Sequence, residues 1–417
     1  MAISCERSSA EEHLGAFGVD VLTSQAQHLT VNDTNLGRKA AAHHERARTT
    51  VAISSLRIAQ LLNSLEVGGA ERMALNLAIA ESHAGHAPLL YCIEREGVLA
   101  SEARAEGIPV TCFDKPAGKS VRTVLQIARA LIRDRIDILH THNPSAHYYG
   151  APAAYLARIP VVNTRHSPIS SRGQKHKERN FKLLLPITDQ VVFVSSDALV
   201  KVERQWQGWQ ASTSVIRNGI PVARFSGHPN RPRLGGKFTF GAVGRLVPVK
   251  RYDLLIDAFQ IVQKSAPDSH LRIVGDGPLA ETLHRRVVEA GLKEAVTIEA
   301  RRLDIERVFH EFDAFVVSSA SEGLPMVVLE AMASGLPIVS TRVGGIAEIV
   351  EEHCFGWFCQ PDDRQSLADA MLKARKFSGL SNAGQMAELA ARNYDISCVV
   401  ERYLEVFTRL KPTRPKN

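Results

Sequence analysis

Residues 318–345 read SSASEGLPMVVLEAMASGLPIVSTRVGG, and this stretch decides the fold of the second half of the chain. The pattern predicts a buried strand, a Gly-Leu-Pro turn, an apolar helix and a second buried strand. A helix that starts at the carboxyl end of a parallel strand presents free N–H groups and a partial positive charge, and phosphates bind at such helix ends. The segment therefore predicts a phosphate site.

Two glutamates stand eight residues apart in this segment. Glu330 is expected about two turns along the helix, where a carboxylate can accept two hydrogen bonds from a ribose diol. Glu322 precedes the helix and would face whatever group the phosphate carries. The alternative is that two glutamates at this spacing lie on the solvated face of a helix. The flanking glycines, prolines and buried strands favour a ligand role.

Short apolar runs alternate with helical patterns along the rest of the chain. Strands are expected at 56–62, 89–93, 110–113, 136–140, 161–164 and 191–194 and, after a Gly- and Pro-rich break at 224–236, at 238–243, 271–274, 296–298, 314–317 and 337–340. Apolar strands that alternate with helices indicate parallel sheets covered on both faces. The predicted fold class is α/β, with two Rossmann-like, doubly wound sheets and ligands in the cleft between them.

The predicted domain boundaries follow the same pattern. Residues 1–50 lack periodicity and are expected to form a poorly ordered extension, followed by a first domain at 51–230 and a second at 231–395. The final segment, 396–417, holds an amphipathic helical stretch that is expected to pack back on the first domain and to end in a basic tail.

The composition is average for a globular protein, with 45% apolar and 23% charged residues, 28 Gly and 19 Pro, which excludes disordered, collagen-like and disulfide-rich classes. No apolar run reaches the roughly 18 residues of a membrane-spanning helix. The six cysteines show no zinc-binding spacing, and the chain does not start with a signal-peptide pattern. These features predict a cytoplasmic protein with reduced thiols.

The net charge of +7 is concentrated in one region of the chain. Residues 51–225 carry 21 Lys and Arg against 14 Asp and Glu, whereas the two flanking regions are nearly neutral. This asymmetry indicates an anionic partner for the first folded half, such as a phosphorylated acceptor or a membrane surface.

Two further segments are expected at the carboxyl ends of strands. Arg245 and Lys250 follow the strand at 238–243 and precede a helix, which places two cations beside the glutamate pair, where a leaving diphosphate needs them most. Gly68 and Gly69 follow the first strand, and glycines there let the backbone approach a ligand closely. A plain tight turn is the alternative for the glycines, because the GxGxxG pattern is absent.

Histidines gather after the next strands of the first half, at positions 140, 142, 147 and 166. A metal site at His140 and His142 is not expected, because Pro144 should end the strand before the two rings can point the same way. His166, followed by Ser-Pro, is the better candidate for a functional imidazole.

Residues 172–186 form a basic segment that contains Arg172, Lys175, Lys177, Arg179 and Lys182 against the single acid Glu178. A basic helix ending in apolar residues can lie on anionic lipid or bind an acceptor phosphate, although a solvated helix face is nearly as plausible. Nucleic acid is not an expected partner, because no aromatic interleaving accompanies the charge.

These residues resemble glycosyltransferase family 4, the retaining nucleotide-sugar-dependent enzymes with the GT-B fold. The resemblance is carried, in order, by GGAER at 68–72, HTHNP at 140–144, NTRHSP at 163–168, VFVSSDAL at 192–199, VIRNGIPVARF at 215–225, VGRLVPVKR at 243–251, IVGDGPL at 273–279 and EGLPMVVLE at 322–330. The stretch LLNSLEVGGAERMALNLA at 61–78 is similar to exopolysaccharide and capsule-assembly members.

The resemblance implies a role for each matching residue. Gly69, Arg245 and Lys250 would contact the donor diphosphate, Glu330 the ribose, Glu322 the transferred sugar, and His166 the donor sugar and the reacting centre. The backbone of Leu324, Pro325, Met326, Val327 and Val328 would contact phosphate and sugar. Catalysis would need no metal and no cofactor, which agrees with the absence of a DxD triplet from the sequence. Arg251 departs from the family pattern, which usually has glycine there.

The resemblance implies a retaining hexosyltransferase that uses a UDP- or GDP-sugar and a polyprenyl-diphosphate-linked glycan at the cytoplasmic face of the membrane, in polysaccharide biosynthesis. A GT-B enzyme with other chemistry, such as a nucleotide-sugar epimerase, is one alternative, and a non-catalytic sugar-nucleotide binder is another. The missing GxGxxG pattern argues against an NAD oxidoreductase.

Overall fold

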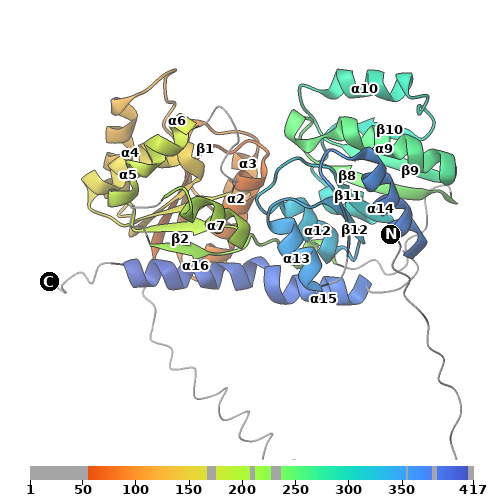
Figure 1. The fold of residues 1–417 in the computed structure, drawn as a ribbon. Coiled ribbons are helices and arrows are strands. Elements are labelled where there is room, and N and C mark those ends of the chain that lie inside the picture. Colours follow the sequence, from red (N-terminus) through yellow and green to blue (C-terminus); the bar gives the residue numbers. More distant parts are fainter. Residues whose placement is uncertain are drawn as a thin grey trace, which may run out of the picture. The chain divides into compact units, whose positions relative to one another are not determined.

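The computed structural model describes residues 55–166, 175–206, 212–226, 236–353, 356–377 and 383–411 (Figure 1). The extension expected at 1–50 lies outside these residues. Residues from Ser55 onward belong to one compact unit, and it contains two separate parallel sheets.

The first sheet has seven strands in the order β3-β2-β1-β4-β5-β6-β7, and every pair is parallel. Its elements are β1 (Arg57–Ser64), α2 (Gly69–His83), β2 (Ala87–Arg95), α3 (Leu99–Ala105), β3 (Val110–Cys112), α4 (Val121–Arg133), β4 (Ile138–His142), α5 (Asn143–Ala157), β5 (Val161–Arg165), α6 (Lys175–Lys182), η1 (Leu185–Ile187), β6 (Gln190–Phe193), α7 (Ser196–Glu203), β7 (Thr213–Val215) and α8 (Val222–Phe225).

The second sheet has six parallel strands in the order β10-β9-β8-β11-β12-β13, which repeats the doubly wound pattern of the first. Its elements are β8 (Phe238–Val243), η3 (Pro248–Lys250), α9 (Tyr252–Ser265), β9 (Ser269–Val274), α10 (Ala280–Glu289), β10 (Val296–Glu299), α11 (Ile305–His310), β11 (Ala314–Val317), α12 (Met326–Ala333), β12 (Ile338–Thr341), α13 (Gly345–His353), β13 (Gly356–Cys359) and α14 (Arg364–Phe377); α15 (Ala383–Tyr394) and α16 (Ile396–Leu410) follow.

The predicted α/β fold class with two Rossmann-like sheets is confirmed. The strands lie where they were expected, within two residues at most ends, but β7 and β13 were not predicted. β7 reads Thr-Ser-Val and β13 begins with Gly and Trp, so neither forms the continuous apolar run that marks the other strands.

Local sequence explains how the elements pack. In α4 the Ser120 hydroxyl accepts a hydrogen bond from the N–H of Thr123 at 3.2 Å and so caps the helix. The apolar residues Ile127 and Leu131, four apart, are buried against the sheet. In β8 the alternate residues Phe238 and Phe240 are buried in one core cluster, because successive strand side chains point to opposite faces.

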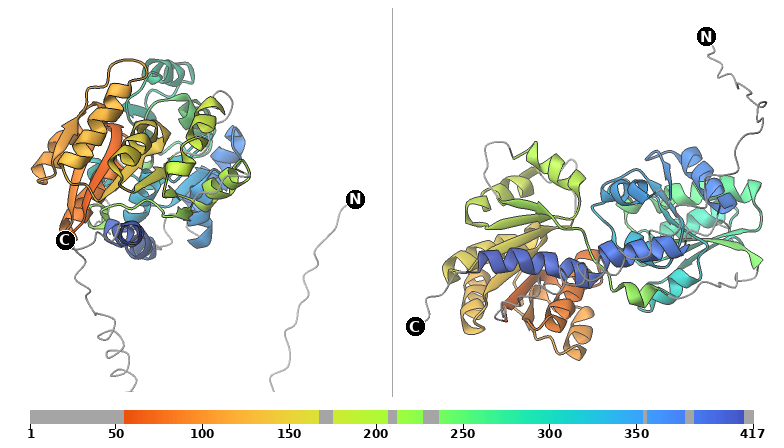
Figure 2. Two further views of the ribbon diagram at one scale, coloured as in Figure 1. Left: turned by 90° about the vertical axis from the view of Figure 1, so that its left-hand side faces the viewer. Right: turned by 90° about the horizontal axis from the view of Figure 1, so that it is seen from below.

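The last two helices run along the side of the unit that faces the viewer in the right-hand view of Figure 2. α15 packs on α12, and α16 packs on α2 in the layer that covers the first sheet. The hydroxyl of Tyr403 on α16 lies 3.1 Å from the Thr164 hydroxyl at the end of β5, although the two residues are 239 positions apart. The fold of the first sheet therefore includes a helix from the far end of the chain.

In the part of the chain that the structure describes, no helix combines the length and the apolar character that a membrane span requires. Cys92, Cys112, Cys359 and Cys398 are free thiols.

Candidate functional site

The segment that opened the sequence analysis forms β11, a loop and α12. Pro325 caps α12 with an extended backbone, and the helix begins at Met326. Glu330 therefore lies little more than one turn along the helix, and the expected two turns are wrong because the Gly-Leu-Pro turn delays the helix start. The first-turn N–H groups of a helix have no intrahelical partner; the N–H of Val328 already donates to the carbonyl of Pro325 at 3.1 Å.

Glu330 is a buried carboxyl with only 8% of its surface exposed. Burial raises its pKa to about 7, and the positive charges of Arg72 and Arg224 act against the rise. Arg72 belongs to α2 of the first half, so Glu330 lies within electrostatic reach of both halves of the protein.

Glu322 and Lys250 form a direct ion pair. The Lys250 Nζ donates to Glu322 Oε1 at 2.6 Å, and the hydroxyl of Ser319 donates to the same oxygen at 2.6 Å. Two further hydrogen bonds join the loops that follow β8 and β11: the Ser318 hydroxyl donates to the Lys250 carbonyl and the Ala320 N–H to the Val249 carbonyl, both at 2.8 Å. This pairing follows from the sheet order, which places β8 beside β11.

Arg245 follows β8 and lies near Glu71 in the first turn of α2. Burial raises the pKa of Glu71, while its own backbone hydrogen bond and the charge of Arg245 lower it. Gly68 and Gly69 precede Glu71, and a Cβ placed on Gly69 would meet no described atom within 4 Å. The glycine turn of the first half thus faces the cationic loop of the second, with open space at Gly69.

Arg251 occupies a left-handed backbone conformation, with φ of 51°. The usual glycine of the family fits this conformation without strain, whereas a side chain there is strained. Arg251 pairs with Asp253 at 3.2 Å and with Asp362, and these ion pairs hold the loop after Lys250.

His166 follows β5, and its Nε2 lies 2.9 Å from His142 Nδ1. Burial lowers the pKa of His166 to about 4, and an interaction with Asn218 partly offsets this effect. The expectation that β4 ends before both histidines align is wrong: β4 reaches His142, and the rings of His140 and His142 lie 4.4 Å apart. Pro144 is accommodated because it occupies the first turn of α5, where no N–H is required.

The carboxyl ends of the two sheets meet through several described residues, among them Gly323, Asn218 and Glu348. A Cβ on Gly323 would come within 2.3 Å of the His166 carbonyl oxygen, so only glycine permits this approach. The Asn218 side chain donates to the Leu324 carbonyl at 2.7 Å. The Glu348 carboxylate accepts from the N–H groups of Ser196 and Asp197 at 3.1 and 2.6 Å, which caps the start of α7. Neither Asn218 nor Glu348 was singled out from the sequence.

The basic segment is described only in part. Arg172 lies outside the described residues, and so do the side chains of Lys175 and Lys177. Glu178 is bound to the buried guanidinium of Arg165, which also stacks 4.7 Å from the Phe181 ring. Arg179 is exposed on α6, whereas the Lys182 ammonium donates to the Gln205 carbonyl.

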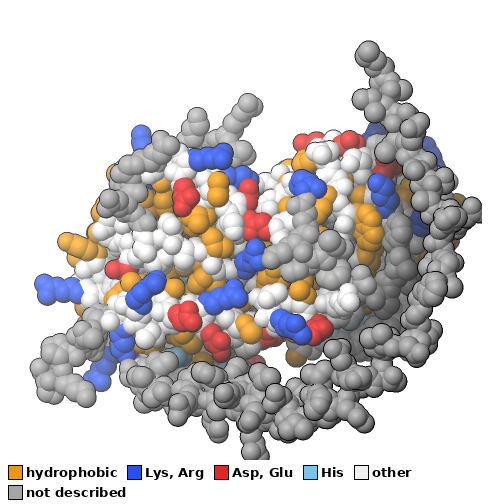
Figure 3. Space-filling model, turned by 60° about the horizontal axis from the view of Figure 1, so that its bottom comes forward, with side chains coloured by type: hydrophobic (Ala, Val, Ile, Leu, Met, Phe, Trp, Pro, Cys, Tyr) orange, Lys and Arg blue, Asp and Glu red, His pale blue; other side chains and the backbone are white. Residues whose placement is uncertain are grey.

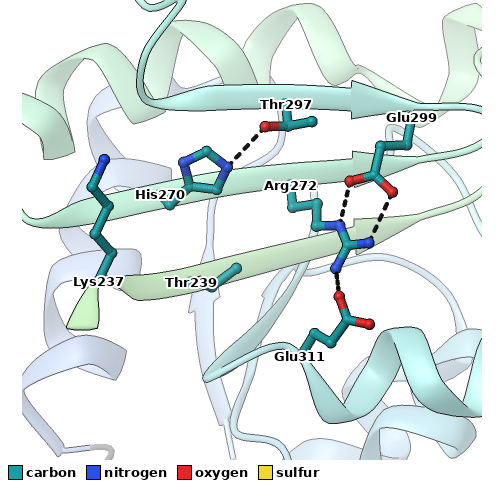
Figure 4. A pocket seen from close by; sticks show the side chains of 7 residues that line it. All are labelled: Lys237, Thr239, His270, Arg272, Thr297, Glu299 and Glu311. Atoms are coloured by element: carbon teal, nitrogen blue, oxygen red, sulfur yellow. Dashed lines mark hydrogen bonds and ion pairs between the residues drawn. The ribbon is translucent and has the colours of Figure 1, made fainter. Parts of the chain in front are cut away.

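A separate hollow of about 400 Å³ lies on the second sheet (Figure 4). Lys237, Thr239, His270, Arg272, Thr297, Glu299 and Glu311 line it. The Arg272 guanidinium bonds Glu299 at 2.6 and 2.8 Å and also binds Glu311, so its donors are used within the protein. This arrangement ties β9, β10 and the end of α11 together and indicates a structural role.

Among the described residues no cluster of three His, Cys, Asp or Glu side chains could hold a metal ion. The groups that meet at the sheet ends are instead cations, carboxylates, an imidazole and a helix N-terminus. Such a set can bind a phosphorylated, hydroxyl-rich ligand.

Two doubly wound sheets with facing carboxyl ends define the GT-B class of fold. Family models agree: the one described as Glycosyltransferase Family 4 matches residues 67–224, and the one described as Glycosyl transferases group 1 matches residues 237–376. The chain therefore belongs to the family 4, or group 1, glycosyltransferases, as the motifs predicted.

Individual proteins show the same relationship. The UDP-Gal:alpha-D-GlcNAc-diphosphoundecaprenol alpha-1,3-galactosyltransferase of Escherichia coli is 27% identical over 292 residues, which cover 66% of this chain and 76% of that protein. The amylovoran biosynthesis glycosyltransferase AmsK of Erwinia amylovora is 28% identical over 196 residues, covering 44% and 48%. The crystal structure of Anabaena Alr3699/HepE in complex with UDP superposes with a TM-score of 0.74 at 24% identity, covers 85% of this chain and all of that one, and shows the shared fold.

Proposed function

We propose that this glycosyltransferase moves a hexose from a UDP- or GDP-sugar to a polyprenyl-diphosphate-linked glycan during polysaccharide biosynthesis, with retention at the anomeric carbon and without a metal. The observation that carries the proposal is the meeting of Lys250, Glu322 and the start of α12 at one sheet end. The name of the Escherichia coli relative, together with the basic first half of the chain, supports the acceptor class, and the name of the Erwinia relative supports a role in polysaccharide biosynthesis.

The proposed binding mode uses the charges at the sheet ends. Arg245, Lys250 and the first N–H groups of α12 hold the diphosphate, and Gly69 lets the other half approach it. Glu330 accepts the ribose hydroxyls. During transfer the bond between the anomeric carbon and the diphosphate oxygen breaks, the acceptor oxygen bonds to the same face of that carbon, and the acceptor proton passes to the leaving phosphate. The cations stabilise the charge that develops on the leaving group.

Glu322 would change partners when the donor binds. In the structure its Oε1 accepts from Lys250 and Ser319. The diphosphate attracts Lys250, and Glu322 then accepts hydroxyl groups of the transferred sugar. The His166 carbonyl lies close to Gly323, and in this proposal the His166 imidazole contacts the same sugar. Glu322 therefore links diphosphate binding to sugar orientation.

The test combines binding and transfer. UDP, GDP, ADP and their hexose conjugates are titrated into the protein in EDTA by calorimetry, and transfer is followed with radiolabelled donors and a synthetic polyprenyl-diphosphate saccharide. Glu322→Gln removes the carboxylate that holds Lys250, so we expect transfer to be lost while affinity for the nucleoside diphosphate is kept or raised. Lys264→Met, on the exposed surface of α9, serves as the matched control for Lys250→Met.

Three results would contradict the proposal: no binding of any nucleotide, metal-dependent binding alone, or full transfer by Glu322→Gln. Hydrolysis or epimerisation of the donor without an acceptor would favour the alternative chemistry instead.

We further propose that the protein works at an anionic membrane surface, at the cytoplasmic face, and that α4 is part of the contact. Val121, Leu125 and Ile132 on α4 are 77%, 43% and 63% exposed. They alternate with the exposed Arg122 and Arg129, which form no ion pair with any described residue. Apolar side chains beside unpaired arginines suit an interface of lipid headgroups and acyl chains.

On the face shown in Figure 3, Lys and Arg side chains are interspersed with Asp and Glu. Arg179 on α6 is exposed and adds a cation to the surface of the first half.

Sedimentation with vesicles of phosphatidylcholine, with and without phosphatidylglycerol, tests the membrane proposal. The double variant Val121→Ser/Leu125→Ser should lose binding to the anionic vesicles. Val288→Ser on α10, where the side chain is 50% exposed, is the control. Equal binding by all three proteins would remove α4 from the contact.

A further inference from the structure

α2 begins at Gly69, in the glycine turn that follows β1. The hydrogen-bond ladder of this helix starts where the Arg72 N–H donates to the Gly68 carbonyl at 2.9 Å. The N–H groups of the three residues before Arg72 have no partner within the ladder. Gly68 has no side chain with which to cap them, whereas Ser120 caps α4. Such a helix start attracts an anion.

The anion that lies at this helix start is the carboxylate of Glu71. A Cβ placed on Gly68 would come within 2.2 Å of Glu71 Oε2, so the carboxylate occupies the space that a side chain at position 68 would fill. A hydrogen bond from the Glu71 N–H favours its charged form. The backbone of Gly68 is extended, with φ of −158°, and any residue adopts this conformation. Glycine therefore leaves room here for the carboxylate rather than for an unusual turn.

The same carboxylate faces the second half of the protein. Arg245 is exposed in the loop after β8, and its positive charge acts on Glu71. Beside Glu71 the space around Gly69 is open, because a Cβ there would meet no described atom within 4 Å. Arg245 and Gly69 are two of the groups that the proposed donor site assigns to the diphosphate. In the free protein both lie beside a negative charge that belongs to the chain itself.

We propose that Glu71 is an internal competitor of the donor diphosphate: its carboxylate holds the start of α2 and faces Arg245 in the free protein, and the diphosphate displaces it. The proposal rests on the donor site described above and adds the residue that limits how tightly this site holds a nucleoside diphosphate. Two anions repel each other at one helix start, so Glu71 must leave when the diphosphate arrives. Glu71 then weakens the binding of the donor and of the nucleoside diphosphate product.

A glutamate at the third position of a helix is also an ordinary helix cap. The two roles predict different effects of Glu71→Gln. A cap alone predicts a lower free energy of unfolding and unchanged affinity for nucleotides. A competitor predicts higher affinity, because the neutral amide no longer repels the diphosphate.

The first test is calorimetric titration of UDP and GDP, in EDTA, into wild type, Glu71→Gln and Glu71→Ala. For the nucleotide that binds wild type, both variants should bind roughly two- to thirtyfold more tightly, which is the range for one charge at a helix N-terminus. Glu71→Ala also removes the side chain from the helix start, so it reveals the gain if the amide of Glu71→Gln keeps its place there. Glu281→Gln, in the first turn of α10 and exposed, is the matched control and should bind like wild type.

The second test asks whether the competition involves Arg245. The same titrations compare Glu71→Gln in an Arg245→Met background with Glu71→Gln in a Lys250→Met background. Lys250 is paired with Glu322, so the gain from Glu71→Gln should persist without Lys250. Without Arg245 the carboxylate and the diphosphate no longer share a cation, and the gain should be smaller. Equal gains in the two backgrounds would contradict the proposal.

Unchanged or weaker nucleotide affinity in both Glu71 variants would also overturn the proposal and leave Glu71 as a helix cap. The donor site itself is judged separately. If Lys250→Met weakens nucleotide binding while the Glu71 variants bind like wild type, the donor site stands and the competition is rejected. If neither wild type nor any variant binds a nucleotide, the proposed function fails and the competition fails with it.

Discussion

Replacement of His147 by Gln should reduce the number of protons that the protein takes up on unfolding in acid by about one, because the buried imidazole is neutral in the folded state. The free energy of unfolding should then depend less on pH. His147 lies on α5, with Nδ1 2.9 Å from the Thr141 hydroxyl and Nε2 2.9 Å from the Thr188 hydroxyl. Burial lowers the pKa of His147 to about 3, and the charge of Arg165 adds to the lowering. Below its ordinary value of 6.5, the unfolded chain therefore binds a proton that the folded chain does not.

The sign and size follow from this difference. Above pH 6.5 the imidazole is neutral in both states, so His147 does not lower the free energy of unfolding. As the pH falls from 6.5 toward 3, protonation of the unfolded chain lowers the free energy of unfolding. At pH 5.5 about nine tenths of the unfolded imidazole is protonated and almost none of the folded one. Wild type should lose about 1.2 kcal/mol of unfolding free energy per pH unit that His147→Gln does not lose.

The assay is a proton count. Each protein is unfolded with urea at pH 5.5 in unbuffered solution, and proton uptake is followed with an indicator dye. The variant should take up about one proton less per chain than wild type. Its stability at pH 8, compared with wild type, gives the separate effect of losing the two threonine contacts. Equal uptake by the two proteins at pH 5.5 would refute the reasoning.

Three further changes test the structure and the site. Gly323→Ala should retain the fold but lose transfer, because its Cβ would come within 2.3 Å of the His166 carbonyl oxygen; a fully active variant would show that the two sheet ends need not approach so closely. Arg272→Met should lower the free energy of unfolding by about 1–3 kcal/mol, because two carboxylates lose their shared partner, and nucleotide affinity should stay unchanged. Arg251→Gly should be nearly neutral in urea unfolding, since relief of the left-handed strain offsets lost ion pairs, whereas Arg251→Val should cost more than about 1 kcal/mol; the reverse order would contradict the strain argument.

The sequence was sufficient for eleven of the thirteen described strands and for the position of Lys250 and Glu322 at the carboxyl ends of β8 and β11. Apolar runs and turn residues are local signals, so the bounds predicted for β8 and β11 are the same as those in the structure. The start of α12 was misplaced because Pro325 suits both a turn and a helix cap, and only the backbone conformation distinguishes the two.

The buried contacts that join His166 to His142, Gln60 and Glu81 could not be predicted in the same way. Gln60, Glu81 and His142 are adjacent only because β1 lies between β2 and β4 and because the strand register sets Gln60 opposite His140. A one-residue slip would turn these side chains to the other face of the sheet. Strand order and register are long-range properties, and the sequence around a single glutamine or glutamate does not indicate them.

The hydrogen bond between Tyr403 and Thr164 has a consequence for synthesis of the protein on the ribosome. The first sheet is translated long before α16, yet α16 packs on α2 and completes the layer that covers this sheet. Domains usually fold in the order in which they emerge. Here the half that is made first cannot bury the face of α2 that α16 covers until α16 has left the exit tunnel, so this domain stays incomplete while the whole second sheet is translated.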